Sequence, residues 1–479
     1  MGDLPDRYWV GNGGDWNQTD TTHWSYTSGG PGGAEVPDET KNVHFDENSF
    51  TLNDQEVLIT YVPADPPLQC HDLDWRGVAH NPTWVFDASG ERTGAAVQIS
   101  GLSFHLDSGM SIETINTAPP EEFDGSIFTS IGGFLSFYPT DEGTTFDIDF
   151  SGVEVPLETD FRTGLNSDVR SLTLQSDINI TSLRLNFGGI FDTNNFNITA
   201  TMIGALTLVN PLTINLGSST ITINRPGYYR NDAFRLYDED IILNAGTSTL
   251  IINNSPLQYL TFDDYGQQWN TVIINGNTGI ETFDESGYIN VYVQFYANWN
   301  WVVERTEQNI RNLIIRPGNL VLFNSGATYN IETFVVKGCN KHRITLANDS
   351  YPDVGTTPED QWIMSIPSNT VNGNYLNIQD SFAAGGALFR AGYRSVDTGN
   401  NDGWLFGSRW TDSFSSKGTT FTDKLSDKGT NWTDKHTSKG TSYSDKHEKK
   451  STSWTDKHSS KGTSWEDKLH SQDEAVDCE

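Results

Sequence analysis

The chain has 479 residues, of which 35% are hydrophobic and 12% aromatic, and its formal net charge is −33. This length is enough for a substantial core, and aromatic residues together with many Asn, Thr and Gly are typical of stacked β-structure. The charge argues against a nucleic-acid-binding surface, because neutralising phosphates requires Lys and Arg. It favours solubility and resistance to self-association.

The first residues, Met-Gly-Asp-Leu-Pro-Asp-Arg, have no apolar run behind a basic segment, so we expect no secretory signal. No stretch approaches the ~20 apolar residues of a membrane span, which predicts that the chain does not insert into a membrane. Three cysteines, Cys70, Cys339 and Cys478, give no even disulfide framework, and we expect them to be free thiols.

Short apolar-alternating runs recur between about residues 170 and 350, each ending at a turn residue. No long segment shows the 3.6-residue period of a helix. The sequence therefore predicts an all-β fold whose body is a parallel β-helix, a solenoid in which each coil buries its face against its neighbours. An array of β-sandwiches or a propeller is the alternative. The predicted strands include 171–174, 182–186, 205–208, 220–224, 249–253, 271–275 and 312–316.

Bulky aromatic residues and glycines gather at both ends of this predicted body. An open stack of strands leaves apolar faces and unpaired edges at its ends, and these invite aggregation unless they are covered. We therefore expect an N-terminal and a C-terminal cap, and we favour this role over a sugar-stacking site. The predicted cap residues are Trp9, Trp16 and Trp24 at one end and Tyr375, Trp404 and Phe406 at the other.

The last part of the chain repeats every eleven residues. Because Ser and Thr dominate it and only two Leu occur, we favour short strands joined by turns over a helical coiled coil. The predicted packing residues form two registers. One holds Trp410, Phe421, Trp432, Tyr443, Trp454 and Trp465, and the other holds Phe414, Leu425, His436, His447, His458 and Leu469. A short strand cannot bury its aromatic residue alone, which predicts a stalk that stacks on itself or on other chains, with a homotrimer as the hypothesis.

Charge separates the repeats from the rest of the chain. Residues 1–409 hold 19 Lys plus Arg against 50 acidic residues, whereas residues 410–479 hold 11 Lys against 13 acidic residues. The predicted domains are therefore an N-terminal capping module at 1–80, the solenoid body at 81–406 and the repeat stalk or docking segment at 407–479.

Two segments carry a family resemblance. The first runs Arg7-Tyr-Trp-Val-Gly-Asn-Gly-Gly-Asp-Trp-Asn, and the second combines Asn374-Tyr-Leu-Asn-Ile-Gln-Asp-Ser with Asp397-Thr-Gly-Asn-Asn-Asp-Gly-Trp-Leu-Phe. Together they resemble the two ends of a class of bacterial and phage surface proteins built on a right-handed parallel β-helix. The eleven-residue Trp-Thr-Asp-Lys repeats look like those at the ends of phage structural proteins.

The resemblance of the two end segments implies exposure on a particle or cell surface, and the repeats favour a phage virion protein. We expect a structural appendage, such as a tail fibre, spike or capsid fibre, that contacts other virion proteins and has host surface polysaccharide as its candidate ligand. A polysaccharide-depolymerising tailspike and a bacterial cell-surface adhesin are the alternatives. The missing export signal favours the phage interpretation, because lysis releases a virion component.

Catalytic and metal-binding interpretations are weaker than structural ones at each candidate cluster. Acidic groups at 238–240, 263–264 and 284–285 are expected to be solvated turn residues, so we name no catalytic residue and expect no enzyme activity. The aligned His436, His447 and His458 share a register with leucines, which indicates packing and not metal binding. Aromatic residues between Tyr292 and Trp301 are expected to pack in the core. No cofactor is predicted.

Overall fold

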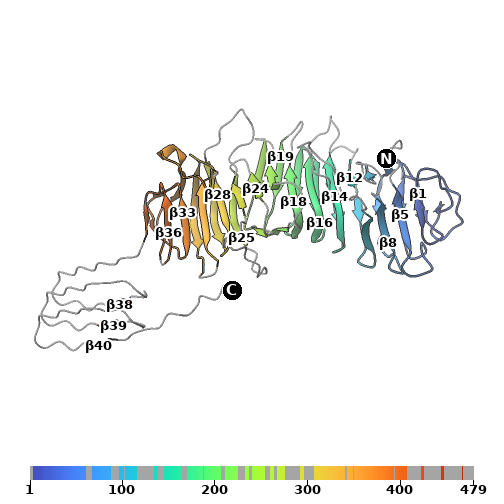
Figure 1. Cartoon of the computed structure of the whole chain (residues 1–479). Coiled ribbons are helices and arrows are strands. Elements are labelled where there is room, and N and C mark those ends of the chain that lie inside the picture. Colours follow the sequence, from blue (N-terminus) through green and yellow to red (C-terminus); the bar gives the residue numbers. More distant parts are fainter. Residues whose placement is uncertain are drawn as a thin grey trace, which may run out of the picture.

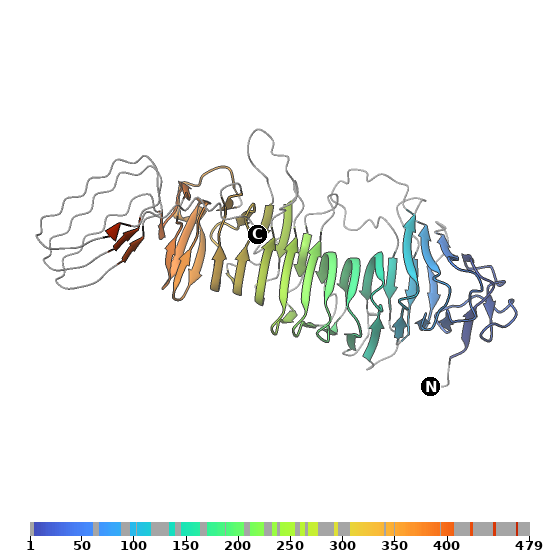
Figure 2. The same ribbon diagram turned by 90° about the horizontal axis from the view of Figure 1, so that it is seen from below.

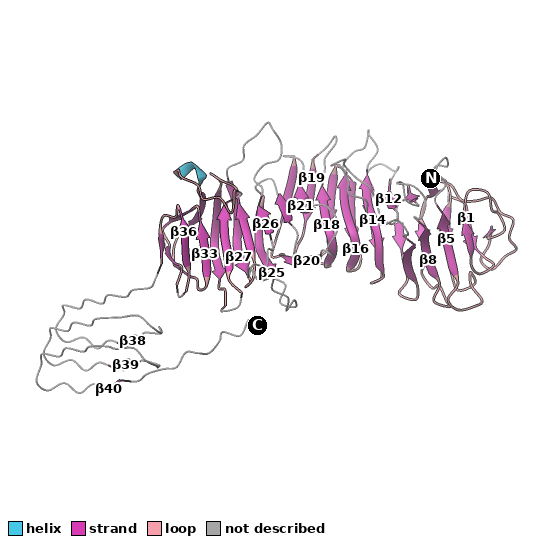
Figure 3. Cartoon of the chain, viewed as in Figure 1, coloured by secondary structure: helices cyan, strands magenta, loops and turns pink. Residues whose placement is uncertain are grey.

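The computed structural model describes residues 4–60, 67–87, 96–101, 103–115, 134–138, 145–162, 170–186, 188–205, 211–224, 232–236, 240–253, 259–263, 267–275, 292–295, 307–339, 342–348, 350–392, 394–406, 422–424, 444–446 and 466–467. In these ranges every regular element is a strand except one short 3₁₀ helix, η1 (Pro358–Asp360). The protein is therefore all-β, as the composition predicts (Figure 3).

The described strands form five hydrogen-bonded groups. The ten-stranded sheet contains β1 (Asp6–Trp9), β3 (Trp24–Ser25), β4 (Asn42–His44), β7 (Leu73–Asp74), β10 (Ser103–His105), β13 (Thr145–Asp149), β15 (Arg170–Leu174), β17 (Gly189–Asp192), β19 (Leu212–Asn215) and β22 (Ile241–Asn244). The four-stranded sheet contains β2 (Gly14–Trp16), β5 (Glu56–Thr60), β8 (Thr83–Asp87) and β11 (Ser111–Ile115).

The longest group contains β6 (Leu68–Cys70), β9 (Ala96–Ile99), β12 (Phe134–Phe137), β14 (Glu154–Arg162), β16 (Ile178–Asn186), β18 (Ile198–Ala205), β20 (Thr220–Asn224), β21 (Asp232–Leu236), β23 (Thr249–Asn253), β24 (Tyr259–Asp263), β25 (Gln268–Asn275), β26 (Tyr292–Phe295), β27 (Glu307–Ile315), β28 (Leu320–Phe323), β29 (Thr328–Val336), β30 (Ile344–Asn348), β31 (Trp362–Ile366), β33 (Leu376–Gln379), β34 (Ser381–Gly385) and β36 (Val396–Gly399). The two three-stranded groups are β32 (Thr370–Asn372), β35 (Leu388–Arg390) and β37 (Trp404–Leu405), and β38 (Thr422–Lys424), β39 (Ser444–Lys446) and β40 (Glu466–Asp467).

Strand pairing among the described residues is parallel, with the single exception of the antiparallel pair β1 and β3. Strands in the middle of a sheet lie between two strands from other parts of the chain; β23, for example, pairs with β20 on one side and β25 on the other. Figures 1 and 2 show these strands side by side along one long axis, from β1 at one end to β36 at the other. The pairings follow this axis and do not close into a barrel, since no described pairing joins β36 to β6.

The core consists of side chains stacked in register along the axis. Successive pairings align Ile221, Leu250, Val272, Leu313 and Phe334, and all five are buried. Their neighbours two positions along each strand form a second buried column. Alternation along a strand sends every second residue inward, so the same pattern that the sequence predicts for 220–224 and 249–253 produces this core.

Glycine permits close stacking where the chain turns between β22 and β23. Gly246 has a φ of +57°, and a Cβ added there would lie 2.4 Å from the carbonyl oxygen of Gly217 in the turn between β19 and β20. The backbone N–H of Thr247 donates to the same oxygen at 2.8 Å. A side chain at position 246 would therefore force the two turns apart.

The expected capping module and body share continuous sheets. Across residue 80, β5 pairs with β8, and β7 pairs with β10. The hydrogen-bonded ladders of the capping module thus continue directly into those of the body.

The expectation of three free thiols is wrong for Cys339, which is buried and disulfide-bonded. An odd number of cysteines leaves one thiol over but does not prevent a pair from forming. Cys70 is free and fully buried, and burial raises the pKa of its thiol. Cys478 lies outside the described residues.

Candidate functional site

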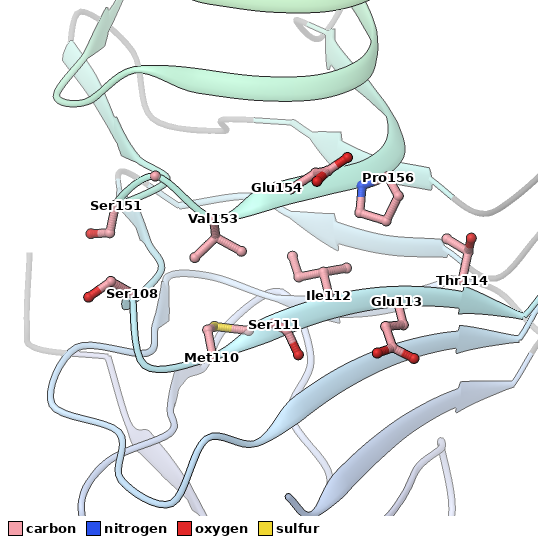
Figure 4. A pocket seen from close by; sticks show the side chains of 11 residues that line it. Ser108, Met110, Ser111, Ile112, Glu113, Thr114, Ser151, Val153, Glu154 and Pro156 are labelled. Carbon is pink, nitrogen blue, oxygen red and sulfur yellow. The ribbon is translucent and has the colours of Figure 1, made fainter. Parts of the chain in front are cut away.

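A groove opens on the side of the body between β11 and β14 (Figure 4). It encloses about 540 Å³, a size within the ~300–1,000 Å³ typical of small-molecule sites. One wall comes from β11 and the turn before it, and the other comes from the turn that leads into β14. The lining residues are Ser108, Met110, Ser111, Ile112, Glu113, Thr114, Ser151, Gly152, Val153, Glu154 and Pro156.

An interruption in strand pairing creates this groove. On one edge, β11 pairs with β8 along its whole length, from Ser111 opposite Thr83 to Ile115 opposite Asp87. No described strand pairs with its other edge, since β14 pairs with β12 and β16. The Ser111 N–H donates toward β8, to the carbonyl oxygen of Pro82. Because successive amides of a parallel strand point to opposite sides, the peptide groups of Ile112 and Thr114 face the groove.

The groove has an apolar floor and a polar rim. Met110, Ile112 and Val153 are buried, whereas Glu113 and Glu154 are exposed. The two glutamates stand on opposite walls, one on β11 and one at the start of β14 (Figure 4). Carboxylates accept hydrogen bonds, and the three serines and Thr114 both donate and accept them. This arrangement suits a neutral ligand rich in hydroxyl groups, with an apolar face for the floor.

Sequence reasoning missed this groove. Glu113 and Glu154 are far apart along the chain and belong to no acidic cluster. The alternation of Ser-Ile-Glu-Thr-Ile at 111–115 indicates that Glu113 points outward, and the sequence offers no stronger local signal. An interrupted ladder depends on which strands pair, and no local pattern records that.

The acidic clusters that the sequence suggests are mostly outside the described residues. Asp240 is described and exposed, and Asp263 ends β24, whereas residues 237–239, 264 and 284–285 are not described. In the aromatic segment, Tyr292 and Phe295 belong to β26, and Tyr296, Trp299 and Trp301 lie outside the described residues.

The predicted N-terminal cap residues lie together inside a large aromatic cluster. Trp9, Trp16 and Trp24 are each 0% exposed. Trp9 meets Trp24 edge to face with ring centroids 5.2 Å apart, and Phe45 stacks on Trp75 at 3.7 Å. Completely buried rings offer no face to a sugar in solvent, so these tryptophans do not form a sugar-stacking surface.

The residues predicted for the C-terminal cap occupy the other end of the body. Trp404 is buried, donates from Nε1 to Ser381 Oγ at 2.9 Å and meets Phe389 edge to face. Phe406 is partly buried and packs against the core. The Tyr375 ring is half-exposed, and the Arg394 guanidinium lies over it at 6.0 Å.

Strands β38, β39 and β40 show how the C-terminal repeats are paired. Asp423 is in register with Asp445, and Asp445 is in register with Asp467. The members of each pair are two repeats apart along the chain. The twelve predicted packing residues themselves, Trp410, Phe414, Phe421, Leu425, Trp432, His436, Tyr443, His447, Trp454, His458, Trp465 and Leu469, lie outside the described residues.

Within the described ranges, no group of three or more His, Cys, Asp or Glu side chains is arranged to hold a metal ion. The same ranges contain no helix long and apolar enough to cross a membrane. No known protein family, curated protein or solved structure matches this chain significantly.

Proposed function

We propose that this chain is a structural appendage of a phage particle, a tail fibre, spike or capsid fibre. In this proposal the body is a parallel β-helix exposed on the virion surface, and residues 407–479 attach or assemble it with other virion proteins. The groove between β11 and β14 binds host surface glycans.

The observation that carries this proposal is the succession of parallel pairings along one axis, with a continuous core from Trp9 to Trp404 (Figures 1 and 2). A β-helix buries apolar surface between neighbouring coils and leaves its flanks to solvent. Such a flank presents a long surface on which a groove stays accessible. The phage assignment is further supported by the resemblance of both end motifs and of the eleven-residue repeats. The acidic composition also supports it, because net charge keeps a crowded particle component soluble.

Glycan binding in the groove is tested by applying the labelled full chain to immobilised host capsule and lipopolysaccharide. Glu113→Gln and Glu154→Gln are expected to weaken binding about 10-fold or more each, because charge-assisted hydrogen bonds to the ligand are lost. Glu56→Gln, an exposed glutamate on β5 outside the groove lining, is the matched control. If all three variants bind the glycan as tightly as the wild type does, the glycan site lies elsewhere.

The positions of Glu113 and Glu154 also favour a second candidate function, hydrolysis of a glycosidic bond. Two carboxylates on opposite sides of a bound sugar are the usual equipment of a glycosidase, one acting as the acid and the other as the base or nucleophile. Incubation of the chain with host polysaccharide tests this alternative by the appearance of new reducing ends. Release of reducing ends that is abolished by Glu113→Gln or Glu154→Gln would establish a depolymerising enzyme.

The proposed function includes self-association, with a homotrimer as the expected form. Copies of the chain can meet in two places, at the stacked repeats and at the solvent flanks of the body. The flanks differ from one another in charge and in exposed apolar surface.

A further inference from the structure

The solvent face formed by β20, β23, β25, β27 and β29 differs from the other flanks of the body. Five consecutive strand segments are in register here, from Thr220 in β20 to Thr333 in β29. Their inward residues form the buried columns of the core. Their outward residues are Thr220, Thr222, Asn224, Thr249, Ile251, Asn253, Thr271, Ile273, Asn275, Asn312, Ile314, Arg316, Thr333, Val335 and Lys337.

An aliphatic stripe runs along the middle of this face. Ile251 is in register with Ile273, Ile273 with Ile314, and Ile314 with Val335. The three isoleucines are half-exposed and Val335 is 41% exposed. At a strand spacing of ~4.8 Å the stripe is roughly 15 Å long. Four β-branched side chains in a row on a solvent face are an unusual use of apolar residues, because scattered single ones are the norm.

The polar side chains in the columns on either side of the stripe form hydrogen bonds with their neighbours on adjacent strands. Asn253 Nδ2 donates to Asn224 Oδ1 at 2.6 Å, and Asn275 Nδ2 donates to Asn253 Oδ1 at 2.7 Å. On the other side Asn312 Nδ2 donates to Thr271 Oγ1 at 3.2 Å. Burying an amide costs little when its hydrogen bonds are retained. These columns are therefore suited to being covered by another surface.

The face also carries no carboxylate among its fifteen outward residues, although the chain has 63 acidic residues. Arg316 and Lys337 follow the last two strand segments, and Lys337 is one of only three lysines before residue 410. At the neighbouring corner Glu332 pairs with Arg311 at 3.5 Å. By contrast, the ten-stranded sheet presents Asp74, Asp149 and Asp192 toward its solvent side.

We infer that this face is the surface through which the body associates with a second copy of the chain. Two molecules that each carry a net charge of −33 repel one another wherever their carboxylates approach. A carboxylate-free face with an aliphatic centre is where that repulsion is smallest and the gain from apolar burial is largest. Arg316 and Lys337 add attraction to the acidic flank of the neighbouring copy.

The inference rests on the proposed self-association, and its test is the mass of the full chain in solution, measured by light scattering after gel filtration over a range of concentrations. The wild type is expected to be a homotrimer. Ile314→Glu places a carboxylate in the stripe and is expected to raise the dissociation constant about 100-fold or more. Ile242→Glu is the matched control, because Ile242 is 51% exposed on β22 of a different sheet.

A second variant distinguishes loss of association from misfolding of the Ile314→Glu chain. Arg316→Glu combined with Lys337→Glu changes only exposed side chains and is expected to weaken association in the same direction. A wild-type monomer at every concentration, an oligomer that survives both variants, or equal disruption by Ile242→Glu would each overturn the inference. None of these outcomes bears on glycan binding by the groove. A wild-type monomer would overturn the proposed self-association together with the inference, whereas equal disruption by Ile242→Glu would overturn only the choice of this face.

Discussion

The body and the C-terminal repeats both stack parallel strands, but they space them differently. In the body, Thr220 pairs with Thr249, Thr249 with Thr271, Thr271 with Asn312 and Asn312 with Thr333, so the length of chain between register partners changes from one pair to the next. In the repeats, Thr422 pairs with Ser444 and Ser444 with Glu466, and the partners are two repeats apart each time.

This difference shows that the strand register is kept in both regions, whereas the length of chain between register partners varies only in the body. In the body the inward residues keep the register although the length of chain between register partners varies, because lengthening a connection has a small entropic cost. The repeats keep one length, in line with the proposed role of residues 407–479 in assembly.

The largest expected effect comes from removing one side chain of the buried column. Leu250→Ala is expected to lower the free energy of unfolding by about 2–5 kcal/mol, because Leu250 is 0% exposed and lies between Ile221 and Val272. Urea unfolding followed by circular dichroism measures it. Ile251→Ala, on the same strand but facing outward, is expected to cost less than about 1 kcal/mol, and equal losses would show that the register does not hold the core.

A smaller effect is expected at the end of the body that precedes the repeats. Ser381→Ala removes the acceptor for the Trp404 indole N–H, leaving a buried donor unpaired at a cost of about 1–3 kcal/mol. Thermal unfolding compares this variant with Ser368→Ala, whose side chain is exposed. If the two variants have the same melting temperature, the Trp404–Ser381 hydrogen bond does not stabilise this end of the body.

A weaker, pH-dependent effect is expected at the N-terminal end. The Tyr26 hydroxyl donates to Glu35 Oε2 at 2.6 Å, and the Arg7 guanidinium pairs with the other oxygen. Chiefly through the Tyr26 hydrogen bond, followed by a backbone hydrogen bond and Arg7, the pKa of Glu35 is lowered from 4.5 to about 2. A lowered pKa means that this stabilisation is present above pH 4.5 and is lost as the pH falls toward 2.

Comparison of the melting temperatures of the wild type and Glu35→Gln, from neutral pH down to about pH 2, tests this expectation. The difference between them should shrink as the pH falls from the ordinary pKa of a glutamate to the lowered one. A difference that stays constant through that window would contradict the assigned role of Glu35.

The smallest effect on stability, but a direct test of the repeat spacing, comes from cysteine cross-linking within residues 407–479. Asp423→Cys with Asp445→Cys joins register partners and is expected to form a disulfide under mild oxidation, because neighbouring strands lie about 5 Å apart. Asp423→Cys with Asp434→Cys, which joins adjacent repeats, is the control. Mass spectrometry of the digested chain identifies each disulfide. Preferential linkage between adjacent repeats would refute pairing between strands that are two repeats apart.

The sequence predicted the strands well wherever inward and outward residues alternate strictly. Residues 220–224 and 249–253 are strands with those bounds, and 271–275 lies within β25. Within the repeats, the described segments 422–424 and 444–446 are strands, in line with the preference for strands over a helical coiled coil.

The pairing partners of each strand, by contrast, cannot be predicted from local sequence patterns. The alternation at 111–115 is typical of a strand, but it holds no information on the partner of each edge, and the groove lies along the edge that lacks a described partner. The outward isoleucines at 251, 273 and 314 look like part of a continuous apolar run. Only the register places them in one stripe on the solvent face. The bonded state of Cys339 likewise depends on the fold.

The central proposal, a virion appendage with an exposed body, is tested most directly by immunogold electron microscopy of purified phage particles. One antibody is raised against the groove region at 103–115 and another against residues 407–479. The proposal predicts that the first antibody labels a projecting structure on intact particles and that the second labels nearer the particle or only disrupted particles. Absence of both labels from intact and disrupted particles would contradict it.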